Sequence, residues 1–225
     1  MVARRHARNG SVAPTRPSGK IAWSGTIVSV QPRIRLTRSF DQRHHSYLGY
    51  TLRVHGLLGT ETREFLVAVG IGTHAKHRFS AGDRVGGEGV AVADSRIETA
   101  DLYKVSKIKI LVRAVAHTGV PPPWHGVPKP LDDYRARGHR RLDARTYGAK
   151  CGSCLWGCRM AVEMIIDQWN PDQRRYRVET FCYGPLSCPW YKAGPTRKVP
   201  GRRGMNYEEE DWVDKEQTSH RTPDE

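Results

Sequence analysis

Three of the five cysteines lie within eight residues, at Cys151, Cys154 and Cys158, and the other two are Cys182 and Cys188. Thiolates bind zinc and iron, and clustered cysteines in a reducing compartment indicate metal or redox chemistry more than disulfides. We therefore expect a metal centre among these five residues. A tetrahedral site needs four ligands; we expect Cys151, Cys154, Cys182 and Cys188, with Cys158 as the substitute.

The segment between the two groups of cysteines predicts a β-hairpin. "AVEMIIDQW" (161–169) and "RRYRVETF" (174–181) are strand-like, and "NPDQ" (170–173) between them is typical of a turn. A hairpin brings its two ends together, so thiolates far apart in the sequence can converge on one ion.

This arrangement resembles a zinc ribbon, in which cysteine pairs at the open end of a hairpin bind one Zn²⁺. The resemblance covers residues 151–188 and implies a structural Zn²⁺. The spacing departs from the ribbon pattern, which has Cys-x₂-Cys on both sides. Here the first side has Cys151-x₂-Cys154-x₃-Cys158 and the second has Cys182-x₅-Cys188.

The departures leave a [4Fe–4S] cluster open as the alternative to Zn²⁺, which we favour slightly because it is the commoner. Three close cysteines, a remote Cys188 followed by Pro189, and a belt of aromatic residues suit such a cluster. The belt is Trp156, Phe181, Tyr183, Trp190 and Tyr191. Buried inert thiols and disulfides are the remaining interpretations.

Residues 21–113 predict a mainly β fold. "GTIVSVQPRIRL" (25–36) and "YTLRVHG" (50–56) alternate at period two, and further strands are expected at 65–69, after the turn "SAGD" (80–83), and in "YKVSKIKILV" (103–112). A short helical or turn segment, "GTHAKHRF" (72–79), separates the third and fourth strands. Five strands with a short helix in this position resemble an OB-fold barrel.

The chain carries 37 basic and 23 acidic residues, for a net charge of +14. Such an excess favours polyanionic partners, chiefly nucleic acid. Eight of the acidic residues lie in the tail (207–225), which either folds back over the basic surface or forms a solvated end. No apolar run approaches the roughly 20 residues of a membrane span, and the basic N-terminus lacks the apolar stretch of a secretory signal, so we expect a cytoplasmic protein.

An OB barrel grips single strands with a basic groove and stacking aromatic residues. The expected contacts to single-stranded DNA or RNA are Trp23, Arg33, Arg35, Arg38, Arg43, Tyr47, Arg53, His55, Arg135, Arg137, Arg140 and Arg141. Basic residues on and beyond the hairpin could extend this footprint: Arg174, Arg175, Arg177, Arg197, Lys198, Arg202 and Arg203.

The predicted organisation has five parts. They are a disordered basic arm (1–20), the OB-like barrel (21–113), a linker rich in proline and arginine (114–149), the cysteine-bound hairpin module (150–192) and a tail that is basic and then acidic (193–225). No P-loop, G-x-S-x-G or H-E-x-x-H motif occurs, and no residue is predicted as a nucleophile or base. The alternatives to nucleic-acid binding are an iron–sulfur electron-transfer protein or subunit and an assembly factor that binds protein partners.

Overall fold

The computed structural model describes residues 19–39, 42–115, 119–209 and 211–224. Its secondary structure is mainly β, as the period-two alternation predicted. The predicted disordered arm lies outside the described residues except for Gly19 and Lys20. None of the helices in the described part of the chain has the length and apolar character needed to cross a bilayer.

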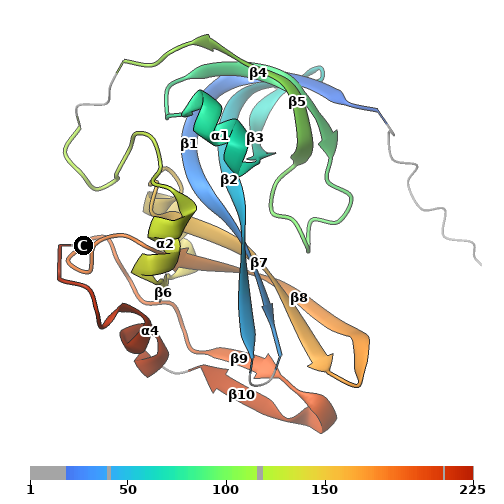
Figure 1. The fold of residues 1–225 in the computed structure, drawn as a ribbon, viewed down its shortest axis with the longest axis vertical. Coiled ribbons are helices and arrows are strands. Elements are labelled where there is room, and N and C mark those ends of the chain that lie inside the picture. Colours follow the sequence, from blue (N-terminus) through green and yellow to red (C-terminus); the bar gives the residue numbers. More distant parts are fainter. Residues whose placement is uncertain (1–18, 40–41, 116–118, 210, 225) are drawn as a thin grey trace, which may run out of the picture.

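The first half of the described chain contains strands and a short helix in the predicted order (Figure 1). They are β1 (Ile21–Arg38), β2 (Arg43–Leu58), β3 (Glu61–Val69), α1 (Ile71–His77), β4 (Arg84–Ala91) and β5 (Leu102–Val112). The predicted inward residues of the first two strands are buried, among them Val30, Ile34, Leu52 and Val54.

These five strands pair in a cycle. Strand β1 pairs antiparallel with β2 and with β4, β2 pairs with β3, and β4 pairs with β5. A parallel bridge between Val67 and Leu102 joins β3 to β5, so the pairings return to the strand from which they began. The side chains inside the cycle form the core, including Trp23, Ile27, Phe65, Val67, Phe79, Val85 and Leu102.

Two glycines allow β1 and β2 to approach closely where the strands bend. Gly25 and Gly56 face each other in the register of the two strands. A Cβ atom on Gly56 would lie 2.2 Å from the carbonyl oxygen of Ser24, so no larger residue fits without moving the backbone.

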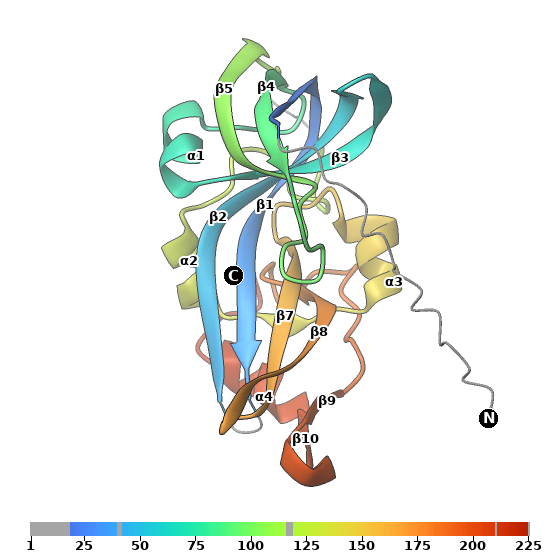
Figure 2. The same ribbon diagram turned by 90° about the vertical axis from the view of Figure 1, so that its right-hand side faces the viewer.

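The second half of β1 has a different neighbour. Residues Arg35–Arg38 pair in parallel with Ala161–Met164 of β7 (Gly157–Asp167), and β7 pairs with β8 (Asn170–Cys182). In the described residues, the hairpin therefore continues one eight-stranded mixed sheet and does not form a small sheet of its own. Figure 2 shows β1 and β2 running from β3, β4 and β5 at one end of the molecule to β7 and β8 at the other.

The hairpin turn lies two residues earlier than predicted. Asp167 pairs with Asn170, so Gln168 and Trp169 form the turn and "NPDQ" begins β8. The Asp167 carboxylate accepts a hydrogen bond from the backbone N–H of Trp169 at 3.0 Å, which closes the turn locally.

The predicted linker and tail both contain secondary structure. The linker holds α2 (Leu131–Arg137), β6 (Arg140–Arg141), α3 (Ala144–Thr146) and a helical turn (Tyr147–Cys151), and Tyr134 of α2 is fully buried. The tail holds β9 (Arg197–Pro200), a 3₁₀ turn (Arg202–Gly204), β10 (Asn206–Glu209) and α4 (Asp211–Thr218).

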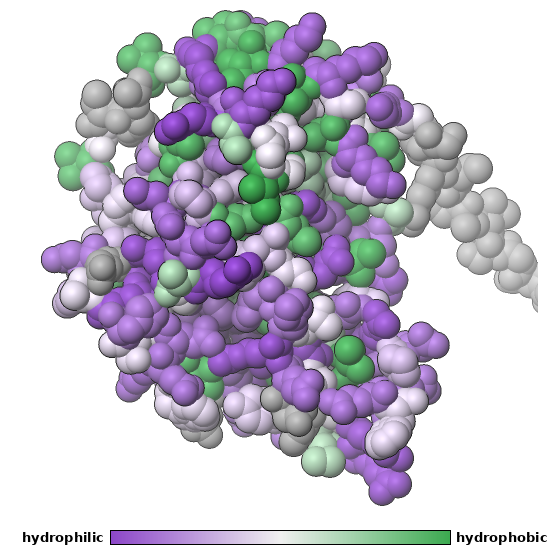
Figure 3. All heavy atoms as spheres, viewed as in Figure 1, coloured by the Kyte–Doolittle hydropathy of each residue, from purple (hydrophilic) through white to green (hydrophobic). Residues whose placement is uncertain are grey.

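The exposed surface differs between the two ends of the molecule. In the view of Figure 3, hydrophobic residues gather at the upper end over β4 and β5, whereas hydrophilic residues cover most of the lower half. Leu111 and Val112 at the end of β5 contribute to the apolar side, since both are more than half exposed.

Candidate metal centre

Four of the five cysteines come from two segments that the hairpin brings together. Cys151 ends the helical turn that follows α3, and the backbone N–H of Cys154 bonds to its carbonyl oxygen at 3.1 Å. Cys182 ends β8, where it faces Gly157 of β7, and Cys188 lies in the loop beyond. The predicted convergence of the two ends of the hairpin is therefore present in the backbone.

These four thiols are close enough to act on one another electrostatically. Burial, together with the smaller effects of the thiols of Cys182, Cys154 and Cys188, raises the pKa of Cys151 to about 12. Burial likewise raises the pKa of Cys154, to about 11, with smaller contributions in the same direction from Cys182 and Cys188. These thiols are therefore neutral in the metal-free protein, and a metal ion that binds them would have to displace their protons, because metal ligation requires thiolates.

Backbone N–H groups point at two of the sulfur atoms. The N–H of Gly184 donates to Cys182 Sγ at 3.4 Å, and this bond opposes the rise that burial causes in the pKa of Cys182. The N–H of Trp156 lowers the pKa of Cys154 in the same way. In both cases the donor lies two residues after the cysteine, so each turn presents a donor that stabilises the thiolate form.

Positive charge and aromatic rings surround the cluster. Arg140 lowers the pKa of Cys182, against the dominant effect of burial, and its guanidinium carbon lies 3.7 Å from the centre of the Tyr191 ring. Lys150 likewise lowers the pKa of Cys151, against the larger effect of burial, and its ammonium group lies over the Trp190 ring. Two rings of the predicted aromatic belt, Trp190 and Tyr191, thus lie beside cations that act on these thiols, whereas Trp156, Phe181 and Tyr183 belong to the main core.

Cys158 lies apart from the other four. Its side chain is completely buried, and its Sγ donates to the carbonyl oxygen of Pro32 at 3.3 Å. Burial raises the pKa of this thiol well above its ordinary value, opposed only by a backbone N–H, that of Ile34. The side chain belongs to the main core, as that of Cys154 also does, but none of the other four cysteines contributes to the shift of its pKa. The role of Cys158 as the substitute ligand stays a prediction.

As the side chains stand, no three His, Cys, Asp or Glu residues of the described chain are placed to hold a metal ion. The thiols would have to rotate or move together to bind one. The donor set nevertheless fits a metal that prefers sulfur, because it supplies four thiols in a partly desolvated site with N–H donors and cations to balance the charge.

The segment that carries Cys151 and Cys154 is docked on strand β1. The Gln31 side-chain amide donates to the carbonyl oxygens of Cys151 at 3.0 Å and Cys154 at 2.8 Å, and Tyr147 donates to its oxygen at 2.7 Å. Ser29 donates to the carbonyl oxygen of Gly152 at 2.9 Å. Gln31 gave no recognisable signal in the sequence, because its partners lie more than a hundred residues away.

Most residues predicted to contact nucleic acid are engaged within the protein. Trp23 is 3% exposed and packs its ring edge-on against Phe65. Arg33 pairs with Glu98 at 2.6 Å and donates to the carbonyl oxygen of Leu48. These side chains therefore support the fold and do not form a free surface.

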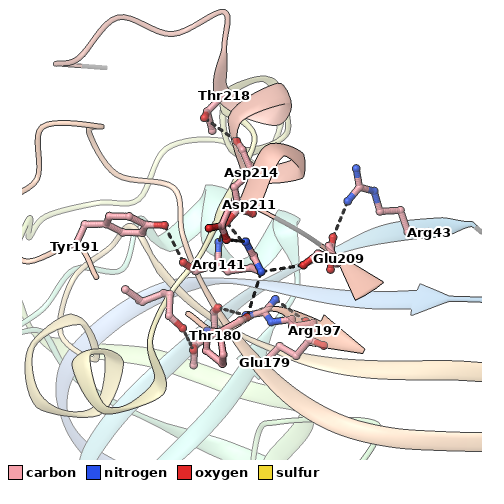
Figure 4. A network of polar contacts seen from close by, with 12 residues as sticks. Arg43, Arg141, Glu179, Thr180, Tyr191, Arg197, Glu209, Asp211, Asp214 and Thr218 are labelled. Carbon is pink, nitrogen blue, oxygen red and sulfur yellow. Dashed lines mark hydrogen bonds and ion pairs between the residues drawn. The ribbon is translucent and has the colours of Figure 1, made fainter. Parts of the chain in front are cut away.

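Three further arginines that were predicted to contact nucleic acid form ion pairs with the acidic tail. Glu209 pairs with Arg38 at 2.9 Å and with Arg43 at 2.8 Å, so the tail folds back over basic residues (Figure 4). Arg141, whose side chain is 1% exposed, pairs with Asp211 and with Asp214 of α4. Of the two alternatives that the sequence left open for the tail, this is the folded-back one.

The remaining members of the set fall into two groups. Arg53 pairs with Glu64, and Arg137 donates to the carbonyl oxygen of Tyr183. Arg140 donates to the carbonyl oxygens of Pro185 and Leu186. Arg135 and His55 are exposed, Arg35 is half-buried, and Tyr47 is half-buried beneath the guanidinium of Arg135. The predicted residues are thus scattered over several environments and are not brought together in one groove.

Comparison with known proteins gave no match, whether to a family model, to a curated protein or to a solved structure.

Proposed function

We propose that this protein binds a metal through Cys151, Cys154, Cys182 and Cys188, and that the metal has a structural role. The observation that carries the proposal is the convergence, at the two ends of one hairpin, of the backbone segments that carry these four cysteines. Zn²⁺ is the preferred occupant and a [4Fe–4S] cluster is the alternative. Metal binding would draw the 151–158 turn and the 182–188 loop together, and so would stabilise the segment docked on Gln31.

Metal analysis of natively purified protein tests this proposal. Protein prepared without oxygen should contain one zinc per chain and should be colourless, whereas an iron–sulfur form would be brown with iron and acid-labile sulfide. Cys→Ser variants at positions 151, 154, 182 and 188 should lose metal. The matched control is Cys158→Ser, which should keep it.

A removal experiment guards against variants that fail to fold. A chelator added to the wild-type protein should lower its melting temperature, and adding back the metal should restore it. Full metal content in all five serine variants would show that the ligand assignment is wrong.

A second candidate function is nucleic-acid binding, and the strand order supports it. The cycle β1–β2–β3–β5–β4–β1, with α1 between β3 and β4, matches the order of an OB-fold barrel. Many such barrels bind oligonucleotides, and the net charge of +14 favours a polyanion. In this chain β1 is partly covered by the docked cysteine segment, so a nucleic acid would need another surface.

Fluorescence anisotropy with labelled oligonucleotides across a salt series tests this second function. Binding to phosphates releases counterions, and the affinity should fall with a log–log slope of roughly −0.7 for each contact on a single strand. Absence of binding at ~100 μM protein in low salt would remove the nucleic-acid function, since non-specific binders usually register there. The metal centre could then serve electron transfer, or the barrel could bind a protein partner.

A further inference from the structure

The tip of the β7–β8 hairpin presents a tryptophan to solvent. Trp169 is 84% exposed at the second position of the two-residue turn, the position that the sequence had assigned to a strand. Large aromatic side chains are usually buried or held at a binding surface, because their exposure to water is unfavourable. This residue therefore needs an explanation beyond the stability of the hairpin.

The Asp167 carboxylate contacts both Trp169 and a nearby arginine, Arg202. Asp167 Oδ1 accepts the backbone N–H of Trp169 at 3.0 Å, and Asp167 Oδ2 lies 3.6 Å from Nε of Arg202. Arg202 comes from the turn between β9 and β10, so Asp167 holds that turn beside the hairpin tip. The side chain of Arg202 is still 48% exposed and keeps donors available for an anion.

A shallow hollow of about 220 Å³ lies between these two turns. Its walls include Ser39, Ile165, Ile166, Trp169, Arg202 and Met205. Gln168 donates to the Ser39 hydroxyl at 3.3 Å and so ties the tip to the end of β1. The hollow therefore has apolar walls, an aromatic ring and a cation on one side.

Exposed charge around the hollow is predominantly basic. Arg203 follows Arg202 with a left-handed backbone (φ 56°), and Arg175 on β8 is also exposed. Asp172 and Glu208 are the exposed acidic residues of the same elements. An aromatic ring beside guanidinium groups is the combination that grips single-stranded nucleic acid, in which a base stacks and the phosphates meet cations.

We infer that the hairpin tip is a site for single-stranded nucleic acid, with a base stacked on Trp169 and the flanking phosphates bound by Arg202 and Arg203. The inference rests on the proposed nucleic-acid function and gives it a location. The nucleic-acid contact would then lie at the end of β1 beside the hairpin tip, and not on the barrel strands, where most of the predicted arginines are engaged within the protein. A paired base cannot stack on the ring without leaving its duplex, so single strands should bind more tightly than duplexes.

The decisive comparison is Trp169→Ala against Trp212→Ala. Trp212 on α4 is 55% exposed and provides a matched control of the same residue type. With a fluorescein-labelled oligo-dT and an oligo-U as probes, Trp169→Ala should weaken binding roughly 5- to 140-fold with an unchanged salt slope, because stacking releases few ions. Trp212→Ala should bind as the wild type does, and Trp169→Phe should recover part of the loss.

The phosphate contacts have their own readout. Arg203→Gln should lower affinity for every sequence and make the log–log salt slope shallower by roughly 0.7. Circular dichroism melts of each variant, matched to the wild type, establish that the fold is retained.

Three outcomes would overturn the inference, and they are distinguishable. Wild-type protein that binds no oligonucleotide would remove the proposed function together with this site. Wild-type binding with equal affinities for Trp169→Ala and Trp212→Ala would remove the site alone. Self-association abolished by Trp169→Ala, with oligonucleotide binding unchanged, would make the tip a protein contact.

Discussion

Gln31 Nε2 lies 2.8 Å from the carbonyl oxygen of Cys154, and this bond joins strand β1 to the turn that carries two predicted metal ligands. The same amide group also bonds to Cys151 and Tyr147, and the Gln31 side chain is buried. An amide that satisfies two carbonyl groups and a hydroxyl group in a buried position fixes the relative placement of the two segments.

Gln31→Leu should therefore destabilise the protein by about 2–3 kcal/mol, because it leaves buried polar groups of the turn without partners. Urea denaturation of the metal-loaded protein measures the change. Gln173→Leu, on the exposed part of β8, makes the same substitution without buried partners and should have little effect. Equal stability of the two variants would mean that Gln31 does not hold the docked segment.

Glu209→Gln should destabilise the protein by about 3 kcal/mol, because Arg38 and Arg43 would lose the charge that compensates them. Glu208, the preceding residue of β10, is exposed and accepts from Thr196. Glu208→Gln is the control and should change the unfolding free energy by less than about 0.5 kcal/mol. If the two variants unfold at the same urea concentration, the ion pairs of Glu209 contribute nothing net.

Stability should fall as the pH drops from about 6.5 to about 4, in part because of His45. Burial and the cations Arg43 and Arg38 lower the pKa of His45 to about 4, whereas Glu209 has a smaller opposite effect and His44 adds to the lowering. Since the unfolded chain then binds the proton more tightly, the stability present above pH 6.5 is lost toward pH 4, by about 3 kcal/mol at most. The neighbouring His139, with its ring centre 4.8 Å away, has its pKa lowered in the same direction by complete burial.

His45→Gln removes one of these titrating groups and should flatten the curve of unfolding free energy against pH in that interval. His44→Gln alters the exposed neighbouring residue and should change the curve only slightly, because His44 makes the smallest of these contributions to the pKa of His45. Parallel curves for His45→Gln and wild type would show that His45 does not titrate abnormally.

Arg141→Lys should loosen α4 even though the charge is kept. The guanidinium of Arg141 reaches Asp214 at 3.0 Å, the carbonyl oxygen of Glu209 at 2.9 Å, and Asp211. A single ammonium group cannot serve these partners at once. Limited proteolysis should then cut residues 211–218 faster than in wild type. Arg145→Lys, at an exposed position, should show the wild-type cleavage rate.

The sequence predicted the alternating strands well because alternation is a local property. Tyr50, Leu52 and Val54 were predicted on one side of a strand, and all three are buried. Trp23 was misassigned to the surface, although it shares the phase of the buried Ile27 on β1. The period-two alternation of β1 therefore predicts a buried Trp23.

The roles of the arginines could not be predicted in the same way. Arg38 and Arg141 read as exposed basic residues, but their carboxylate partners lie 171 and about 70 residues further along the chain. Only the tertiary fold brings such charges together. The hydrogen bond of Cys158 likewise has its acceptor, the Pro32 carbonyl oxygen, on a strand that is distant in the sequence.

Strand β1 belongs to two groups of strands, and this has a consequence for how the molecule comes apart. Its first residues pair with β4 and its last with β7, while β2 follows it along almost the whole length. A protease that cuts the chain between residues 113 and 150 would leave two fragments that stay associated, because the 18-residue strand β1 of the first fragment pairs with β7 of the second. Because both groups of strands share β1, the intact protein should unfold in a single cooperative transition. A substitution at the cysteines should then also destabilise the strands at the opposite end of the protein.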